Sequence, residues 1–215
     1  VPTGNFGNVF AGYAAARMGL PVKQLVVATN RNDILARFFA TGEMSARPVI
    51  PTLSPSMDIQ VSSNFERLLF DMLDRDGGRV REAMAAFRDN GAMTVDRQRV
   101  AETCELLYAG ALDDEGTLAV IAETHRETGL LIDPHSAVGI HVGRAVRRDG
   151  SAPLVALATA HPAKFPDAVE DATGIRPELP PPLADLFERE EHFEVLANDP
   201  AAVQAFIRAR VTVTA

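Results

Sequence analysis

The sequence contains no tryptophan and a single cysteine, Cys104, among its 215 residues. One cysteine excludes an intrachain disulfide framework and is typical of a reducing compartment, so we expect a cytoplasmic protein. Cys104 lies on an apolar face with Val100, Leu107 and Tyr108, which predicts a buried structural thiol. Aromatic residues make up only 6% of the chain and hydrophobic residues 47%, which is the composition of an ordinary globular protein.

The chain also lacks an excess of positive charge and any long apolar run. It has 21 Lys and Arg against 29 Asp and Glu, for a formal net charge of −8. A nucleic-acid-binding protein needs a basic face to displace counterions from phosphate, and only Arg144, Arg147 and Arg148 cluster. No apolar run reaches the roughly 18–20 residues that span a membrane. We therefore predict neither a nucleic-acid partner nor a membrane partner.

Several common active-site signatures are missing. There is no His-Glu-x-x-His motif and no cysteine pair, and His135 and His141 lie on different sides of a predicted helix, so no metal site is predicted. The Gly-x-Ser-x-Gly elbow of serine hydrolases is absent as well. The glycine-containing segment near the start matches neither the P-loop nor Gly-x-Gly-x-x-Gly.

Apolar segments of strand and helix character alternate along the chain, which predicts an α/β protein with helices on both faces of an open sheet. Short continuous apolar runs predict strands at 24–29, 130–133 and 154–158. Apolar periodicity and end signals predict helices at 7–18, 34–40, 65–73, 79–89, 97–109, 114–127, 134–147 and 162–172, and from 200 onwards. Ser63 and Glu66 have the spacing of a capping box.

The domain organisation follows from these elements. Residues 1–62 and 128–178 form the α/β part, with a long loop at 43–62, and 63–127 form an almost wholly helical insertion. Residues 179–215 are a tail that begins with a rigid Pro180-Pro181-Pro182 linker and ends in a helix.

The segment Gly4-Asn5-Phe6-Gly7-Asn8 directly precedes the first predicted helix. Glycines at a helix N-terminus let the backbone approach an anion, which the free amides and the helix dipole then bind. A plain glycine-rich turn with an asparagine N-cap explains the same residues. Spacing alone leaves both alternatives open.

Four further segments join polar side chains to strand ends or loops. One is the Thr159–Phe165 segment, which ends a predicted strand where open α/β sheets bind ligands and which contains His161 and Lys164. The others are residues 133–136, 29–33 and 54–58. Helix capping, plain turns or exposed side chains account for each segment taken alone.

Five motifs occur in one order along the chain. They are Val1-Pro2-Thr3-Gly4-Asn5-Phe6-Gly7-Asn8, Ala28-Thr29-Asn30-Arg31-Asn32-Asp33, Ser56-Met57-Asp58, Asp133-Pro134-His135-Ser136-Ala137-Val138 and Thr159-Ala160-His161-Pro162-Ala163-Lys164-Phe165. Together they resemble bacterial threonine synthase, from Val1 to about Pro180. The combination of the first and last motifs is specific.

The resemblance implies a three-layer, largely parallel open sheet of the fold type II kind and pyridoxal 5′-phosphate as cofactor. It implies a lyase of threonine biosynthesis that converts O-phospho-L-homoserine and water to L-threonine and phosphate. The cofactor would be bound by Gly4, Asn5, Phe6, Gly7, Asn8 and Thr159. Gly4 to Asn8 would hold its phosphate, and Thr159 would meet its pyridine nitrogen. Asn30, Asp58 and His135 are candidate contacts of the substrate.

The resemblance covers only the C-terminal part of the family. The Schiff-base lysine is expected upstream of Val1, in an N-terminal half that would also be a partner of this chain. Lys23 is predicted to be a surface residue. Lys164 belongs to the last of the five motifs, and the resemblance implies that it is not the Schiff-base lysine of the family. No catalytic residue is therefore expected in this chain, and we expect the fragment alone to be inactive.

Two other functions remain open. One is a related pyridoxal-phosphate lyase acting on another phosphorylated amino acid or amino alcohol. The other is a non-catalytic anion-binding domain, which the missing lysine favours. If the chain is a fragment, the face around Phe6, Asn30 and Thr159 should be open and expose apolar surface.

Overall fold

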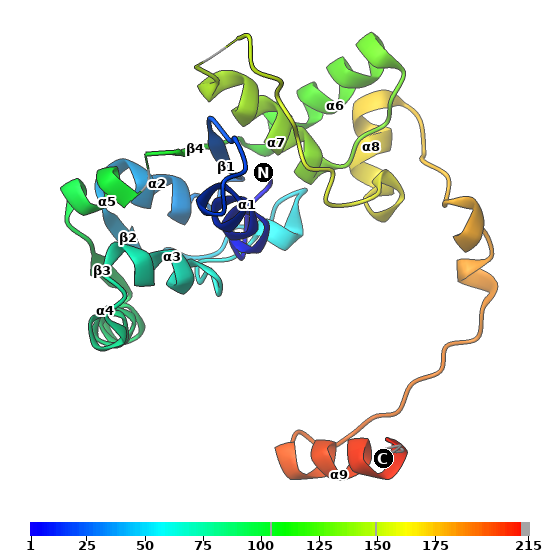
Figure 1. The fold of residues 1–215 in the computed structure, drawn as a ribbon. Helices are drawn as coiled ribbons and strands as arrows, with labels where there is room; N and C mark the ends of the chain where they lie inside the picture. Colours follow the sequence, from blue (N-terminus) through cyan, green and yellow to red (C-terminus); the bar gives the residue numbers. More distant parts are fainter. Residues whose placement is uncertain (104, 149, 212–215) are drawn as a thin grey trace. The chain divides into compact units, whose positions relative to one another are not determined.

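The structure, a computed structural model, describes residues 1–103, 105–148 and 150–211, so the predicted burial of Cys104 lies outside the described residues. The chain divides into two compact units, Val1–Glu178 and Leu179–Ala215. The elements of the first unit follow in the order α1 (Gly7–Arg17), β1 (Leu25–Thr29), α2 (Ile34–Thr41), β2 (Glu43–Ser45), η1 (Pro55–Met57), α3 (Phe65–Met72), α4 (Gly77–Asn90), β3 (Ala92–Thr94), α5 (Arg97–Thr103), β4 (Leu107–Ala111), α6 (Asp114–Thr128), α7 (Pro134–Val146), η2 (Pro162–Lys164) and α8 (Pro166–Thr173) (Figure 1). The second unit contains η3 (Pro181–Leu183), η4 (Leu186–Glu188) and α9 (Pro200–Arg210).

A small parallel sheet organises the first unit. β1 pairs with β4 in parallel, from Leu25 opposite Leu107 to Thr29 opposite Ala111. The chain start lies along the other edge of β1, where the Thr3 amide donates to the Ala28 carbonyl at 2.8 Å. All five residues of β1 are buried, as expected of a parallel strand covered on both faces.

A second, antiparallel pair joins β2 to β3. Both strands are three residues long and follow helices that end at glycines in the left-handed conformation, Gly42 and Gly91. No side chain opposes that conformation at glycine, which lets the chain reverse directly into each strand.

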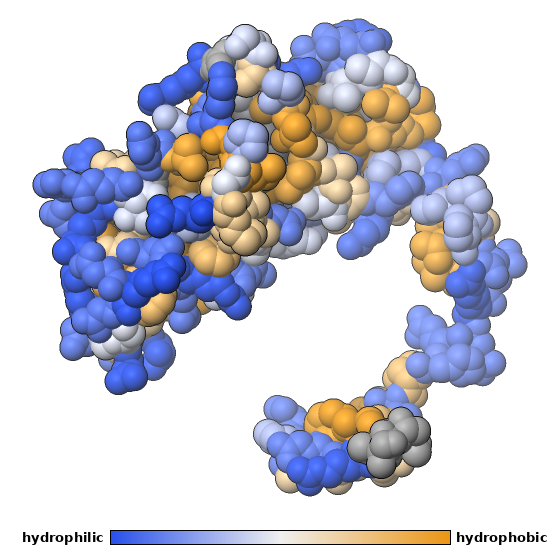
Figure 2. Space-filling model, in the orientation of Figure 1, coloured by the Kyte–Doolittle hydropathy of each residue, from blue (hydrophilic) through white to orange (hydrophobic). Residues whose placement is uncertain are grey.

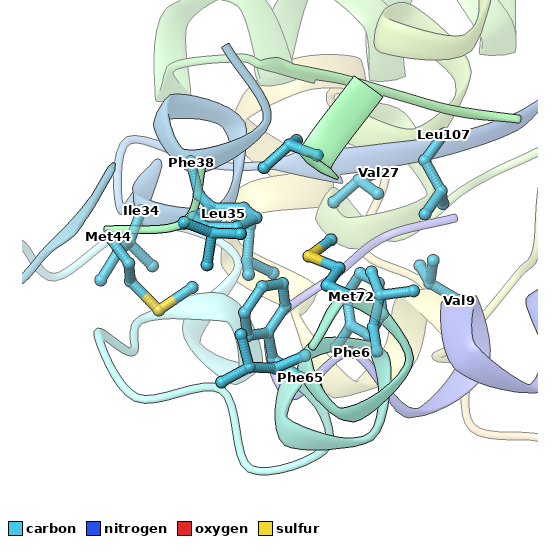
Figure 3. Close-up of a cluster of buried hydrophobic side chains, with 14 of the residues drawn as sticks. Phe6, Val9, Val27, Ile34, Leu35, Phe38, Met44, Phe65, Met72 and Leu107 are labelled. Carbon is cyan, nitrogen blue, oxygen red and sulfur yellow. The ribbon is translucent and has the colours of Figure 1, made fainter. Parts of the chain in front are cut away.

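The main core lies between α1, α2, α3 and the first face of β1. Its side chains point toward one another from these elements, with Phe6, Phe38 and Phe65 among them (Figure 3). Phe38 and Phe65 meet edge to face with ring centroids 4.8 Å apart, and Phe6 meets Phe65 in the same way at 5.6 Å. These rings fix the start of α1, because Phe6 is the residue before its first turn.

Most predicted helices are confirmed, but the predicted 97–109 helix is too long. It ends at Thr103, and Leu107 to Ala111 form β4 instead. The apolar spacing of Val100, Leu107 and Tyr108 fits a helix locally, whereas pairing with β1, more than 80 residues earlier, decides for a strand. The description of 63–127 as almost wholly helical is therefore wrong at β3 and β4, and the 43–62 loop begins with β2.

Two predicted strands are also wrong. Residues 130–133 and 154–158 form no strand in the described structure. Leu130 is 64% exposed and Val155 73% exposed, so these apolar residues lack the cover that a buried strand receives. The capping box is wrong too, because α3 begins after Asn64 and no side-chain cap bond forms there.

The helices on the other face of β1 form a second core. α7 packs against β1 and β4, and α6 packs against α7 and α8. Asp113 and Asp133 cap α6 and α7 by accepting hydrogen bonds from the first-turn amides. No helix in the described part of the chain is both long and apolar enough to cross a membrane.

Candidate functional site

A cavity of about 250 Å³ opens beside the start of α1. Its wall brings together residues from five separate parts of the sequence. The lining residues are Pro2, Thr3, Gly4, Asn5, Phe6, Gly7, Asn8, Val9, Ser56, Met57, Asn64, His135 and Thr159. The structure thus places Gly4 to Asn8, Thr159 and His135 on one wall.

The backbone of the loop before α1 suits an anion. Phe6 has φ 63 and ψ 8, in the left-handed region, and the helical residue Gly7 follows it. Alternation between left- and right-handed residues turns successive amides toward one point. No side chain caps this end of α1, so its first amides and the positive end of its dipole are available to a ligand.

Residues 62–64 brace this loop by its carbonyl groups. The Ser62 hydroxyl donates to the Gly4 carbonyl at 2.9 Å, and the Asn64 side chain donates to the Asn5 carbonyl at 2.9 Å. Arg67, one turn further along α3, donates to the Asn64 side chain. These contacts occupy carbonyl oxygens of the loop and leave its amides for a ligand. These contacts could not be predicted from the sequence, because the polar residues 62–64 have the composition of an ordinary helix start.

His135 is buried at the start of α7, with 3% of its surface exposed. Its Nδ1 lies 2.9 Å from Oδ1 of Asp133, and its ring packs on Phe165 with centroids 4.8 Å apart. Within the described residues, Nε2 has no hydrogen-bond partner. The site therefore contains a held imidazole with an unsatisfied nitrogen.

Asp133 is ionised in this arrangement. Its burial favours the neutral acid, but hydrogen bonds from the His135 ring and the Ser136 hydroxyl outweigh that effect and hold the pKa of Asp133 below its usual value. An ionised Asp133 accepts, so Nδ1 of His135 carries the proton that lies between them.

Thr159 lies on the cavity wall directly after the exposed apolar residues 154–158. The next residues turn into η2, where Nδ1 of His161 accepts a hydrogen bond from the Ala163 amide at 3.1 Å. His161 is thus a capping residue and is not among the residues that line the cavity.

Asn30 and Asp58 are not among the lining residues either. The side-chain amide of Asn30 donates to Oδ1 of Asp58 at 2.8 Å, and the side-chain amide of Asn32 donates to the same oxygen at 2.9 Å. Oδ1 also accepts from the Thr52 hydroxyl at 2.7 Å. This buried network holds the loop that carries Ser56 and Met57 to the cavity.

The expected open face is found in part. Phe6 and Asn30 are themselves 1% exposed, because Phe6 joins the core and Asn30 joins the Asp58 network, although Phe6 also lines the cavity. Thr159 is exposed, and Leu154, Val155 and Leu157 before it are exposed apolar residues. Figure 2 shows hydrophobic surface over the region that Figure 1 draws around α7 and β1.

Neither lysine is among the residues that line the cavity. Lys164 lies with its Nζ 5.8 Å from the centre of the Phe165 ring, and Lys23 is exposed in the turn before β1. Within the described residues, no group of three or more His, Cys, Asp or Glu side chains is placed to hold a metal ion.

Fold and site together define an α/β protein that presents an uncapped glycine–asparagine helix start beside a parallel sheet. The family model "Threonine synthase, C-terminal" matches residues 136–207. The chain is 55% identical over 208 residues to threonine synthase of Pseudomonas aeruginosa, covering 96% of this chain and 44% of that protein.

Solved structures agree. The PLP-bound threonine synthase of Brucella melitensis superposes with a TM-score of 0.88 at 48% identity, covering 97% of this chain and 45% of that one. Threonine synthase from yeast superposes with a TM-score of 0.83 at 33% identity, covering 96% of this chain and 46% of that one. Over nearly its whole length, the chain is similar to the C-terminal portion of threonine synthases. It spans about half the length of the curated relatives that it matches.

Proposed function

We propose that this chain forms the cofactor-phosphate side of a pyridoxal-phosphate-dependent threonine synthase. The reaction converts O-phospho-L-homoserine and water to L-threonine and phosphate. The observation that carries the proposal is the cavity that joins the Gly4–Asn8 loop to Thr159 and His135. The solved relative that is described as PLP-bound supports the choice of cofactor.

The residues present fit a phosphate group. The first amides of α1 and its dipole attract the negative charge of a phosphate group, and Ser62 and Asn64 hold the loop in place through its carbonyl groups. A backbone site of this kind needs no positively charged side chain. This agrees with a lining that contains no lysine or arginine.

Thr159 is proposed to meet the pyridine nitrogen of the cofactor. When bound, pyridoxal phosphate supplies an electron sink for carbanion chemistry. A threonine hydroxyl, unlike a carboxylate, does not force a ring nitrogen to stay protonated, so it sets a milder sink. The lysine that holds the cofactor is proposed to come from the other half of the enzyme, whose segments would complete a largely parallel fold type II sheet.

For the substrate we propose a direct contact only from His135. Asn30 and Asp58 act through the loop they brace, because their polar atoms pair with one another. That loop presents Ser56 and Met57 to the cavity. Asn30 and Asp58 thereby shape the substrate side without touching it.

A chimera tests the proposed function. This chain would replace the matching 208-residue stretch of the Pseudomonas aeruginosa enzyme, and threonine and phosphate would be measured with O-phospho-L-homoserine as substrate. We expect threonine formation, and we expect Gly4→Ala to abolish it by displacing the loop. Gly77→Ala, in open space at the start of α4, is the matched control and should leave the rate unchanged.

A folded chimera that releases no phosphate from O-phospho-L-homoserine would contradict the proposal. Parallel assays with O-phospho-L-serine would then show whether the chain serves another phospho-amino-acid lyase. Absence of turnover on both compounds, with the cofactor bound, would favour a non-catalytic anion-binding role.

A further inference from the structure

His135 lines a cavity whose other lining residues are neutral, and its Nε2 is buried without a hydrogen-bond partner among the described residues. Among the described residues that line the cavity, it is the one titratable side chain. We propose that Nε2 of His135 binds an oxygen of a phosphate ester in this cavity through a shared proton, and that Asp133 is the positioning residue that holds the ring for it. The proposal rests on the proposed function, because it takes a phosphate ester as the occupant.

The burial of the ring makes the contact energetically meaningful. A polar atom that is buried without a partner destabilises the folded chain, because it has given up its hydrogen bonds to water. His135 is 3% exposed and Nε2 lacks a partner within the described residues, so a ligand atom that pairs with it recovers that cost. Nδ1 is not available for this, because it donates to Asp133.

The chemistry of the two partners matches. Because Nδ1 donates to Asp133, Nε2 can pair with an oxygen of a phosphate ester through a single proton that lies between the two atoms. The proton that the ester monoanion carries comes to lie between its oxygen and Nε2. No charged group is left unpaired in the cavity in this arrangement.

Asp133 is the charged group that contacts the His135 ring, which lies at the N-terminus of α7. β1 and β4, which pack on α7, contain no Asp, Glu, Lys or Arg. Glu123 of α6 pairs with Arg144, which lies near the end of α7 opposite to His135. The Phe165 ring packs on His135, and the Nζ of Lys164 lies 5.8 Å from the centre of the Phe165 ring.

Nitrogen NMR on the full chain labelled at histidine and at backbone amides tests the proposal. The first probe is pyridoxine 5′-phosphate, which has the phosphate of the cofactor but no aldehyde, and the second is O-phospho-L-homoserine. We expect the His135 Nε2 signal to move toward the protonated position, together with the amides of Gly7 and Asn8, while Nδ1 stays protonated. The probe that moves Nε2 further identifies the source of the phosphate.

Different results separate the two proposals. Movement of the Gly7 and Asn8 amides without movement of His135 would overturn the role of His135 and leave the proposed function standing. If neither probe moves the loop amides at millimolar concentration, the phosphate site itself is wrong and both proposals fall.

Variants give a second measurement. His135→Gln should weaken pyridoxine 5′-phosphate binding by about tenfold, whereas His141→Gln, exposed on the same helix, should leave it within twofold. Asp133→Asn should lose the Nδ1-protonated signature of His135, since an amide donates to Nδ1 and favours the other tautomer. An unchanged tautomer in this variant would rule out Asp133 as the positioning residue.

Discussion

A Cβ atom on residue 4 would lie 2.6 Å from the carbonyl oxygen of Ser56, a distance that no real Cβ keeps. Gly4 is therefore required by the close approach of two backbones, the one that begins the Gly4–Asn8 loop and the one that carries Ser56. The contact joins the chain start to the 43–62 loop at the edge of the cavity.

The first prediction concerns this contact. Gly4→Ala should destabilise the chain by about 1–3 kcal/mol, because the Ser56 backbone must move to make room. For a chain of this size, each 1 kcal/mol lowers Tm by about 2–4 °C. Thermal unfolding followed by circular dichroism measures the change. Gly77→Ala is the control, and equal Tm values for the two variants would contradict the prediction.

The second prediction concerns the buried network around Asp58. Asp58→Ala removes the acceptor of the Asn30 and Asn32 amides and should cost about 2–4 kcal/mol, because two buried donors lose a charged partner. Urea unfolding measures the loss. Glu82→Ala, on the exposed face of α4, should stay within about 0.5 kcal/mol. A stable Asp58→Ala chain with weakened substrate binding would instead assign Asp58 to direct contact.

The third prediction concerns acid stability. The pKa of Asp133 is lowered in the folded chain, so its stabilisation is present above the ordinary value of 3.8 and is lost as the pH falls through the folded-state pKa. Asp133→Asn should be less stable at pH 7 by about 1–3 kcal/mol. When the pH is lowered by about 1 unit from pH 4, the free energy of unfolding of Asp133→Asn should decrease less than that of the unmodified chain.

Urea unfolding at a series of pH values measures this difference. Asp185→Asn provides the comparison, since Asp185 is an exposed partner of Arg189 and its charge is screened by solvent. If the free energy of unfolding decreases equally with falling pH in Asp133→Asn and in the unmodified chain, Asp133 contributes nothing to acid stability.

The fourth prediction concerns the lysines. Neither Lys23 nor Lys164 lines the cavity, so incubation with pyridoxal phosphate followed by borohydride should leave no stoichiometric adduct on either residue. Peptide mapping by mass spectrometry makes the measurement, with Lys23→Arg and Lys164→Arg chains as controls. Full modification of one lysine, abolished by its own arginine variant, would refute the prediction.

The order of helices was predictable because its signals are local. Gly7 to Arg17 form an apolar helix beside a glycine-rich start, and Asp133-Pro134 marks the start of α7 with an acceptor followed by a proline. The motifs also indicated the similarity to threonine synthases that the comparisons show.

The pairings of strands and the functions of single polar residues were decided by the tertiary structure. Residues 107–111 form strand β4 because they pair with β1. The apolar residues 154–158 form no strand, because no described segment pairs with them. Sequence patterns report the periodicity of one segment, whereas sheet hydrogen bonds depend on a second segment far along the chain.

The sequence by itself determined most of the helices and the similarity of this protein to threonine synthases. Only the tertiary structure decided that Asn30 and Asp58 form hydrogen bonds with each other. It also decided that Nε2 of His135, a residue that lines the same cavity as the Gly4–Asn8 loop, has no hydrogen-bond partner among the described residues. The reason is physical, because a polar side chain binds a ligand only with atoms that the fold has not already paired.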